Sequence, residues 1–93
     1  MLDLGPGVGA LVLNTGRELH GVEIEISLTG CDHERSHKQV HERRVAGRPL
    51  YAAVFDRLAA GDYTLWLDDR PLQRHVSVTG AAVTHLSIKE EHA

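Results

Sequence analysis

The sequence predicts an all-β fold: a seven-stranded antiparallel β-sandwich, formed by one domain over residues 1–93. Turn-forming residues recur about every ten positions, which is the spacing of sandwiches and barrels. Between these turns, apolar and polar residues alternate as they do in half-buried strands. A chain of 93 residues, 42% of them hydrophobic, can bury one modest core but not two. The expected strands cover residues 8–14, 21–29, 36–45, 50–56, 62–68, 72–79 and 82–89.

Residues 21–29 are the clearest of these strands. In the segment "GVEIEISL", alternation places Val22, Ile24, Ile26 and Leu28 on one face and polar residues on the other. By contrast, "ALVL" at 10–13 and "LYAAVF" at 50–55 are apolar on both faces. We expect these two strands to be covered on both sides.

Three histidines, His33, His37 and His41, lie four residues apart in the segment "HERSHKQVHERR" at 33–44. On a helix this spacing would bring their imidazoles onto one face, as in a metal site. A helix over 33–46 would have only three apolar residues, so it would have no apolar stripe to bury. A strand that turns back at Ala46-Gly47 needs no such stripe. We therefore expect an edge strand over 36–45, with successive histidines about 13 Å apart and no shared metal ion.

The strand at 62–68 is expected to point the single tryptophan away from the core. In "DYTLWLD", alternation places Tyr63, Leu65 and Leu67 inward and Trp66 outward. A tryptophan at such a position is covered by a partner subunit, covered by the edge hairpin, or part of a ligand platform. We expect Trp66 to contact either another protein or a second copy of the chain in a homodimer.

The last two expected strands, 72–79 and 82–89, each carry one histidine that we expect to face outward. If a three-residue loop at 79–81 joins them in a hairpin, His75 lies directly opposite His85. Their Cβ atoms would then be about 4.5–5.5 Å apart, close enough to share a metal ion. Because two ligands without a third bind metal weakly, the alternative interpretation is an exposed polar pair.

Charge is unevenly distributed along the chain. The formal net charge is -3, yet residues 33–48 carry a local charge of +3. This basic segment indicates either an anionic partner or a solvated sheet edge. Nucleic acid is not the expected partner, because no aromatic residue precedes Tyr51. The residues predicted to form the interface are Trp66, His37, His41, Arg43 and Arg44.

The lone cysteine, Cys31, forms no internal disulfide and favours a reducing compartment. The apolar run near the start is too short for a signal peptide or a membrane span. We therefore expect a cytoplasmic protein with no membrane contact and no cofactor. None of the four serines lies in a Gly-x-Ser-x-Gly motif, which disfavours a hydrolase of that type.

The segments "AAVFDRLAAGDYTLWL" and "HVSVTGAAVTHLSI" together resemble carboxypeptidase-regulatory-like and Cna-B-type domains. The resemblance implies the transthyretin, or prealbumin-like, sandwich, and it implies little about activity. The positions that carry it are Phe55, Leu58, Gly61, Tyr63, Thr64, Val76, Val78 and Gly80. The whole chain is also similar to a group of short proteins from high-GC bacteria, some of which are labelled phospholipases.

The sequence favours a non-catalytic accessory or protein-interaction module that acts through an exposed sheet face and a basic edge hairpin. The first alternative is a small-ligand or metal-binding domain that uses His75 and His85. The second alternative is a minimal hydrolase.

Overall fold

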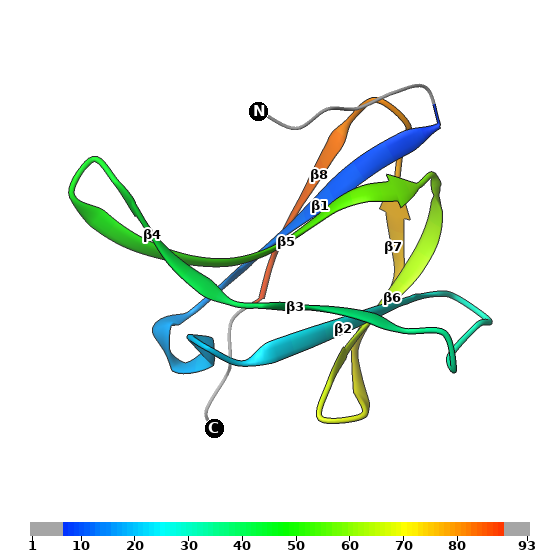
Figure 1. Ribbon diagram of the computed structural model, residues 1–93, viewed down its shortest axis with the longest axis horizontal. Coiled ribbons are helices and arrows are strands. Elements are labelled where there is room, and N and C mark those ends of the chain that lie inside the picture. Colours follow the sequence, from blue (N-terminus) through cyan, green and yellow to red (C-terminus); the bar gives the residue numbers. More distant parts are fainter. Residues whose placement is uncertain (1–6, 89–93) are drawn as a thin grey trace.

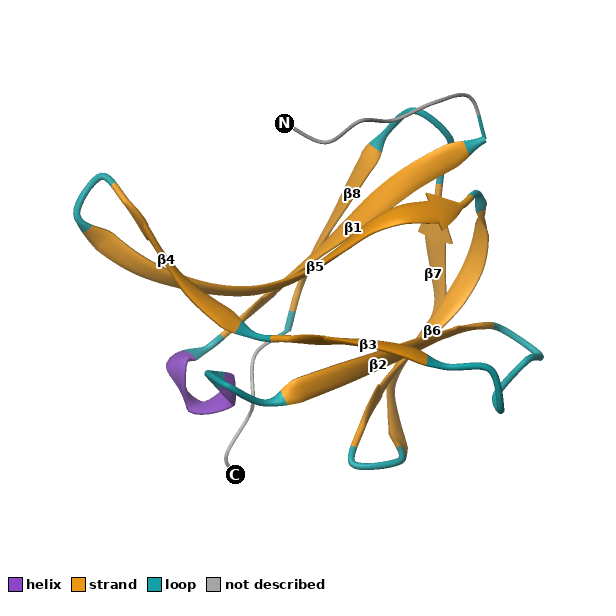
Figure 2. Cartoon of the chain, viewed as in Figure 1, coloured by secondary structure: helices purple, strands orange, loops and turns teal. Residues whose placement is uncertain are grey.

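The computed structural model describes residues 7–88, which form eight β-strands and one short 3-10 helix (Figures 1 and 2). The elements in chain order are β1 (Val8–Thr15), η1 (Arg17–Leu19), β2 (Glu23–Leu28), β3 (Ser36–Gln39), β4 (His41–Val45), β5 (Arg48–Ala59), β6 (Gly61–Leu67), β7 (Arg70–Val78) and β8 (Val83–Ser87). The all-β prediction is confirmed for this range. Within it, no helix has the length and apolar character needed to cross a membrane.

The strands form two four-stranded sheets. The first sheet has the order β4-β5-β1-β8, and the second has the order β3-β2-β6-β7. Strand pairs are antiparallel except for β1 and β8, which run parallel from Ala10 opposite Val83 to Asn14 opposite Ser87. The prediction of a fully antiparallel fold was therefore wrong. After β7 the chain leaves the second sheet and enters the first in the same direction as β1.

The strand predicted at 36–45 is divided between the two sheets. β3 is an edge of the second sheet and β4 is an edge of the first, so the described residues hold eight strands where seven were expected. Val40 lies at the crossing and is fully buried. Its N–H donates to the carbonyl of Val22 at 2.9 Å, and its carbonyl accepts from the N–H of Gly21 at 2.9 Å. The segment is extended, as predicted, and its histidines do not line one helical face.

The inward residues of both sheets meet in one core. Leu11 and Leu13 of β1 pack in the same cluster as Ile24 and Ile26 of β2. The cluster also includes Ala53 and Phe55 of β5, Tyr63 and Leu65 of β6, and Val76 and Val78 of β7. Alternation therefore assigned the inward faces correctly in most strands. Leu28 is an exception, because it is 43% exposed at the end of β2.

Candidate functional site

A groove of about 620 Å³ lies beside the crossing from β3 to β4. Its apolar floor is formed by Val12 of β1 together with Ala52 and Val54 of β5. These residues alternate with core residues such as Leu13 and Phe55, so they lie on the side of the first sheet that faces away from the core. The remaining lining residues are polar or charged: Lys38, Gln39, His41, Glu42, Arg43 and Asp56.

Several cations near the groove have no carboxylate partner in the described part of the chain. Among residues 7–88, no carboxylate oxygen lies within 4.0 Å of the side-chain nitrogens of Lys38, Arg43 or Arg48. Arg44 differs, because its Nε lies 3.7 Å from Oε2 of Glu42. The groove therefore joins an apolar floor to cations that have no carboxylate partner among residues 7–88.

The groove continues onto a hairpin that carries exposed apolar residues. β4 and β5 are joined at Ala46-Gly47, and Figure 1 shows this hairpin extending away from the rest of the first sheet. Val45 is 55% exposed and Leu50 is 48% exposed. Leu50 lies opposite Arg43 in the register, and Val45 lies two residues after Arg43 on the same strand. Alternation therefore places both apolar side chains on the face of the hairpin that carries Arg43 and the groove.

The residues predicted to form one interface lie on two different sheets. His41 and Arg43 line the groove, whereas Arg44 alternates to the other face of β4. His37 belongs to β3 of the second sheet, where its Nε2 lies 3.4 Å from Oε2 of Glu23. Trp66 also belongs to the second sheet. His37 and Trp66 thus share the second sheet, whereas the residues of β4 belong to the first sheet.

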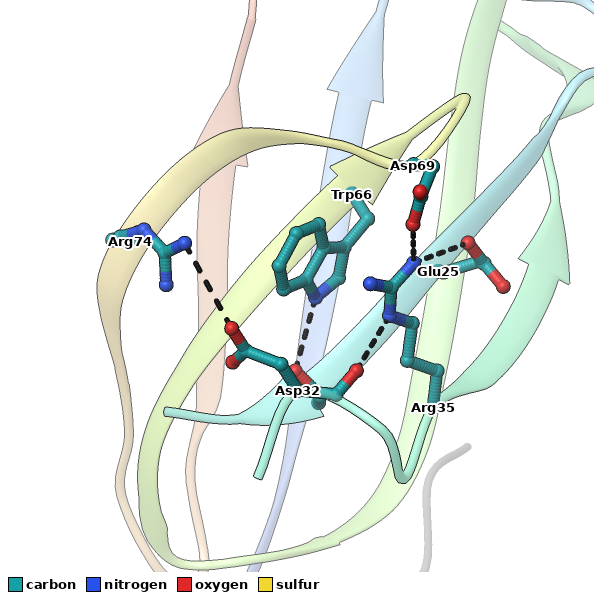
Figure 3. Close-up of polar contacts among 7 residues, drawn as sticks. Glu25, Asp32, Arg35, Trp66, Asp69 and Arg74 are labelled. Carbon is teal, nitrogen blue, oxygen red and sulfur yellow. Dashed lines mark hydrogen bonds and ion pairs between the residues drawn. The ribbon is translucent and has the colours of Figure 1, made fainter. Parts of the chain in front are cut away.

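Trp66 points away from the core, as predicted, but it is 5% exposed, so the prediction that it is open to solvent was wrong. Its ring lies on the outer side of the second sheet, opposite Glu25 in the register. The guanidinium carbon of Arg35 lies 3.8 Å from the ring centroid, and that of Arg74 lies 5.3 Å from it. The indole Nε1 donates to Oγ of Ser27 at 2.9 Å. In the view of Figure 3 the indole lies between the two arginines. Their short distances to the ring account for its low exposure.

Arg35 is held over the ring by polar contacts from two of its three guanidinium nitrogens, Nε and Nη1. Nη1 donates to Oδ1 of Asp69 at 2.7 Å and to Oε1 of Glu25 at 3.2 Å, and Nε donates to the carbonyl of Asp32 at 2.8 Å (Figure 3). The hydrogen bond that Arg35 donates to Asp69 raises the pKa of Arg35, which stays charged. This cluster fixes the loop after β2 onto the sheet, so it is a structural cluster and not an open platform.

Replacing Arg35 with alanine should expose the indole. Since Trp66 is the only tryptophan, we expect its fluorescence emission to shift to longer wavelength and its quenching by acrylamide to increase. Arg70→Ala, which removes an exposed arginine at the start of β7, is the matched control and should leave both signals unchanged. An Arg35→Ala spectrum identical to that of the unmodified protein would contradict this description.

His75 and His85 do not face each other. β7 pairs with β6 in the second sheet, whereas β8 pairs with β1 in the first and places His85 opposite Val12. The predicted hairpin was therefore wrong. His75 has a positive φ of 62°, and its Nδ1 lies 2.9 Å from Oδ2 of Asp62. Within residues 7–88, no group of three or more His, Cys, Asp or Glu side chains is arranged to hold a metal ion.

The groove floor was missed by the sequence analysis. Because "LYAAVF" is apolar on both faces, we expected both to be covered, yet Val54 is only half-buried and lies in the groove. The signal was present in the sequence, since an apolar outer face beside a basic edge also describes an open binding surface. No sequence signal identified Arg35 as the cover of Trp66.

Comparison with known proteins adds little beyond these observations. No family model matches the chain, and no curated protein matches it. Among solved structures, the chain is similar to a leucine-rich repeat protein from Bacteroides thetaiotaomicron VPI-5482, with 13% identity and a TM-score of 0.48. The match covers 91% of this chain but 12% of that protein. A likeness at this level assigns no function.

Proposed function

We propose that this chain is a non-catalytic protein-interaction module that binds an acidic segment of another protein along the groove and the β4–β5 hairpin. One observation carries the proposal: an apolar floor lies beside cations that have no carboxylate within 4.0 Å in the described residues. Such a surface is complementary to carboxylates spaced between apolar side chains.

The distribution of charge supports a specific role for Arg43. Arg43 lines the groove and can bind a carboxylate. Glu42 and Asp56 also line it, and their negative charges limit where a second anion can bind. The exposed Val45 and Leu50 extend the apolar surface toward the hairpin turn. A partner that placed a carboxylate near Arg43 and apolar side chains on either side of it would satisfy both features.

We also propose that the strands follow the prealbumin-like topology and that the protein is cytoplasmic. Of the positions that carry the resemblance to carboxypeptidase-regulatory-like and Cna-B-type domains, Phe55, Tyr63, Val76 and Val78 pack in the core, and Thr64 is fully buried. That burial supports a prealbumin-like arrangement. The half-buried free thiol of Cys31 supports a reducing compartment.

Reversal of one charge tests the proposed function. The probe, the glutamate-valine peptide, is a blocked seven-residue peptide with glutamate at its centre, valine two residues to either side of it, and serine elsewhere, so that all three side chains lie on one face when the peptide is extended. Its binding is measured by isothermal titration calorimetry at low salt. We expect Arg43→Glu to weaken binding about tenfold or more, because a carboxylate on the peptide would then meet a carboxylate on the protein. We also expect affinity to fall as salt is raised.

Two controls accompany this test. Arg70→Glu makes the same change in net charge at an exposed arginine of the second sheet, and it should change affinity by about twofold or less. A peptide with lysine in place of glutamate should bind much more weakly than the acidic one. Equal weakening by Arg43→Glu and Arg70→Glu would show a nonspecific charge effect and would overturn the proposal.

A further inference from the structure

We infer that the acidic segment binds as an added strand at the free edge of β4, so that it becomes a fifth strand of the first sheet. This inference rests on the proposed function and specifies how the partner is held. β4 is an edge strand with β5 on one side, and all five of its residues are exposed. An edge strand presents unpaired N–H and C=O groups, to which an extended segment can hydrogen-bond.

The hairpin register identifies those unpaired groups. Ala46 and Gly47 have φ values of 52° and 78°, as in a two-residue type I′ turn, so the flanking Val45 and Arg48 form a hydrogen-bonded pair. Hydrogen-bonded and non-hydrogen-bonded pairs alternate along an antiparallel ladder. The N–H and C=O groups of residues 43 and 41 therefore point to β5, whereas those of residues 42 and 44 point away from it.

Two other residues agree with this assignment. Pro49, which has no N–H, lies opposite Arg44 at a position where the ladder needs no donor. Val40 is two residues before Glu42, and its N–H and C=O bond to Val22 and Gly21. The residues that precede β2 thus already occupy this edge as far as Val40, and no residue within 7–88 hydrogen-bonds to it at Glu42 or Arg44.

The side chains of β4 favour an acidic strand over a second copy of the chain. If two copies paired antiparallel about Arg43, the backbone groups of Glu42 in one copy would hydrogen-bond to those of Arg44 in the other. That register aligns two Glu42–Arg44 pairs of opposite charge, yet each β4 carries a net charge of +1, and Arg43 lies directly opposite Arg43 of the other copy, where like charges are destabilising. A strand with a carboxylate opposite Arg43 keeps the backbone hydrogen bonds and replaces the repulsion with attraction.

Proline substitution separates strand addition from binding by side chains alone. Proline at position 42 removes an N–H that points away from β5, so the β4–β5 hydrogen bonds remain, as they do where proline occurs on natural edge strands. We expect Glu42→Pro to weaken binding of the glutamate-valine peptide about tenfold or more. The matched control Glu42→Ala removes the same carboxylate, keeps the N–H, and should bind at least as tightly as the unmodified protein.

A second measurement keeps the test valid if Glu42→Pro unfolds. The unmodified protein is titrated with the same peptide N-methylated at alternate residues, which blocks one edge of the peptide backbone. One of the two N-methylation patterns should abolish binding, because an added strand uses one edge only. Two patterns that both bind as tightly as the parent peptide would overturn the inference.

The outcomes distinguish the inference from the proposed function. If Glu42→Pro binds the peptide as tightly as Glu42→Ala while Arg43→Glu loses binding, strand addition is wrong and the proposal of an acidic partner is retained. If Arg43→Glu also binds normally, both are wrong. Sedimentation equilibrium of the protein alone tests whether a second copy binds the β4 edge instead. A dimer that Glu42→Pro dissociates would show that it does, and would overturn the inference that an acidic segment binds there.

Discussion

Replacing Trp66 with alanine is expected to lower the free energy of unfolding by about 3–5 kcal/mol. The side chain is 5% exposed, so its removal leaves a large cavity between the outer side of the second sheet and the loop that covers it. The change also leaves Oγ of Ser27 without its donor from the indole. Urea unfolding followed by far-ultraviolet circular dichroism measures the effect, since the variant has no tryptophan fluorescence.

Trp66→Phe is the control for this prediction. Phenylalanine keeps an aromatic face beneath Arg35 and loses the Nε1 donor and part of the buried volume. We therefore expect a smaller loss than for alanine, because large-to-small changes cost stability in proportion to the cavity that remains. A loss of less than about 1 kcal/mol for Trp66→Ala would mean that the ring is not buried as described.

Replacing Val40 with aspartate is expected to lower the free energy of unfolding by about 3 kcal/mol or more. Val40 is fully buried at the point where the chain crosses from the second sheet to the first. A carboxylate at this position would lose its hydration inside the core. It would also disturb the backbone hydrogen bonds that Val40 makes with Val22 and Gly21. Chemical denaturation of the two proteins at pH 7 measures the difference.

Val45→Asp is the matched control for Val40. It is the same substitution five residues further along, at a side chain that is 55% exposed on the hairpin. We expect it to change stability by about 0.5 kcal/mol or less, since surface substitutions seldom do more. Equal losses for the two variants would contradict the assignment of Val40 to the core.

The fold class and most inward faces could be predicted from local pattern. In β2 and β7, alternation correctly placed Ile24 and Ile26, and Val76 and Val78, in the core. The physical reason is that successive side chains of a strand point to opposite faces, so a strand with one buried face must alternate. Leu28 follows the same pattern but lies at the end of β2, where nothing covers it fully, and it is 43% exposed.

Strand neighbours could not be predicted in the same way. Alternation says which face of a strand is buried, but it does not say which strand lies beside it. The hairpin expected between His75 and His85 satisfied the pattern, yet β8 pairs with β1 in the other sheet. Likewise, the pattern over 36–45 is extended throughout, and only the position of Val40 in the core shows that the segment serves two sheets.

The candidate site was predicted in part for the same reason. His41 and Arg43 were predicted from the basic segment, and both line the groove. The floor formed by Val12 and Val54 depends on β1 lying beside β5, which is a long-range pairing. The burial of Trp66 depends on Arg35, which lies 31 residues earlier in the chain and reaches the ring only because β2 pairs with β6.

The sequence by itself determined that the chain forms strands, which residues of most strands turn inward, and that a basic segment precedes a hairpin. These properties follow from the two-residue period of a strand and from local turn chemistry. Only the tertiary structure decided that Trp66 is covered, that His75 and His85 are apart, and that an apolar floor lies beside Arg43. Each of these depends on which strands become neighbours, and that choice is made by the packing of the whole core.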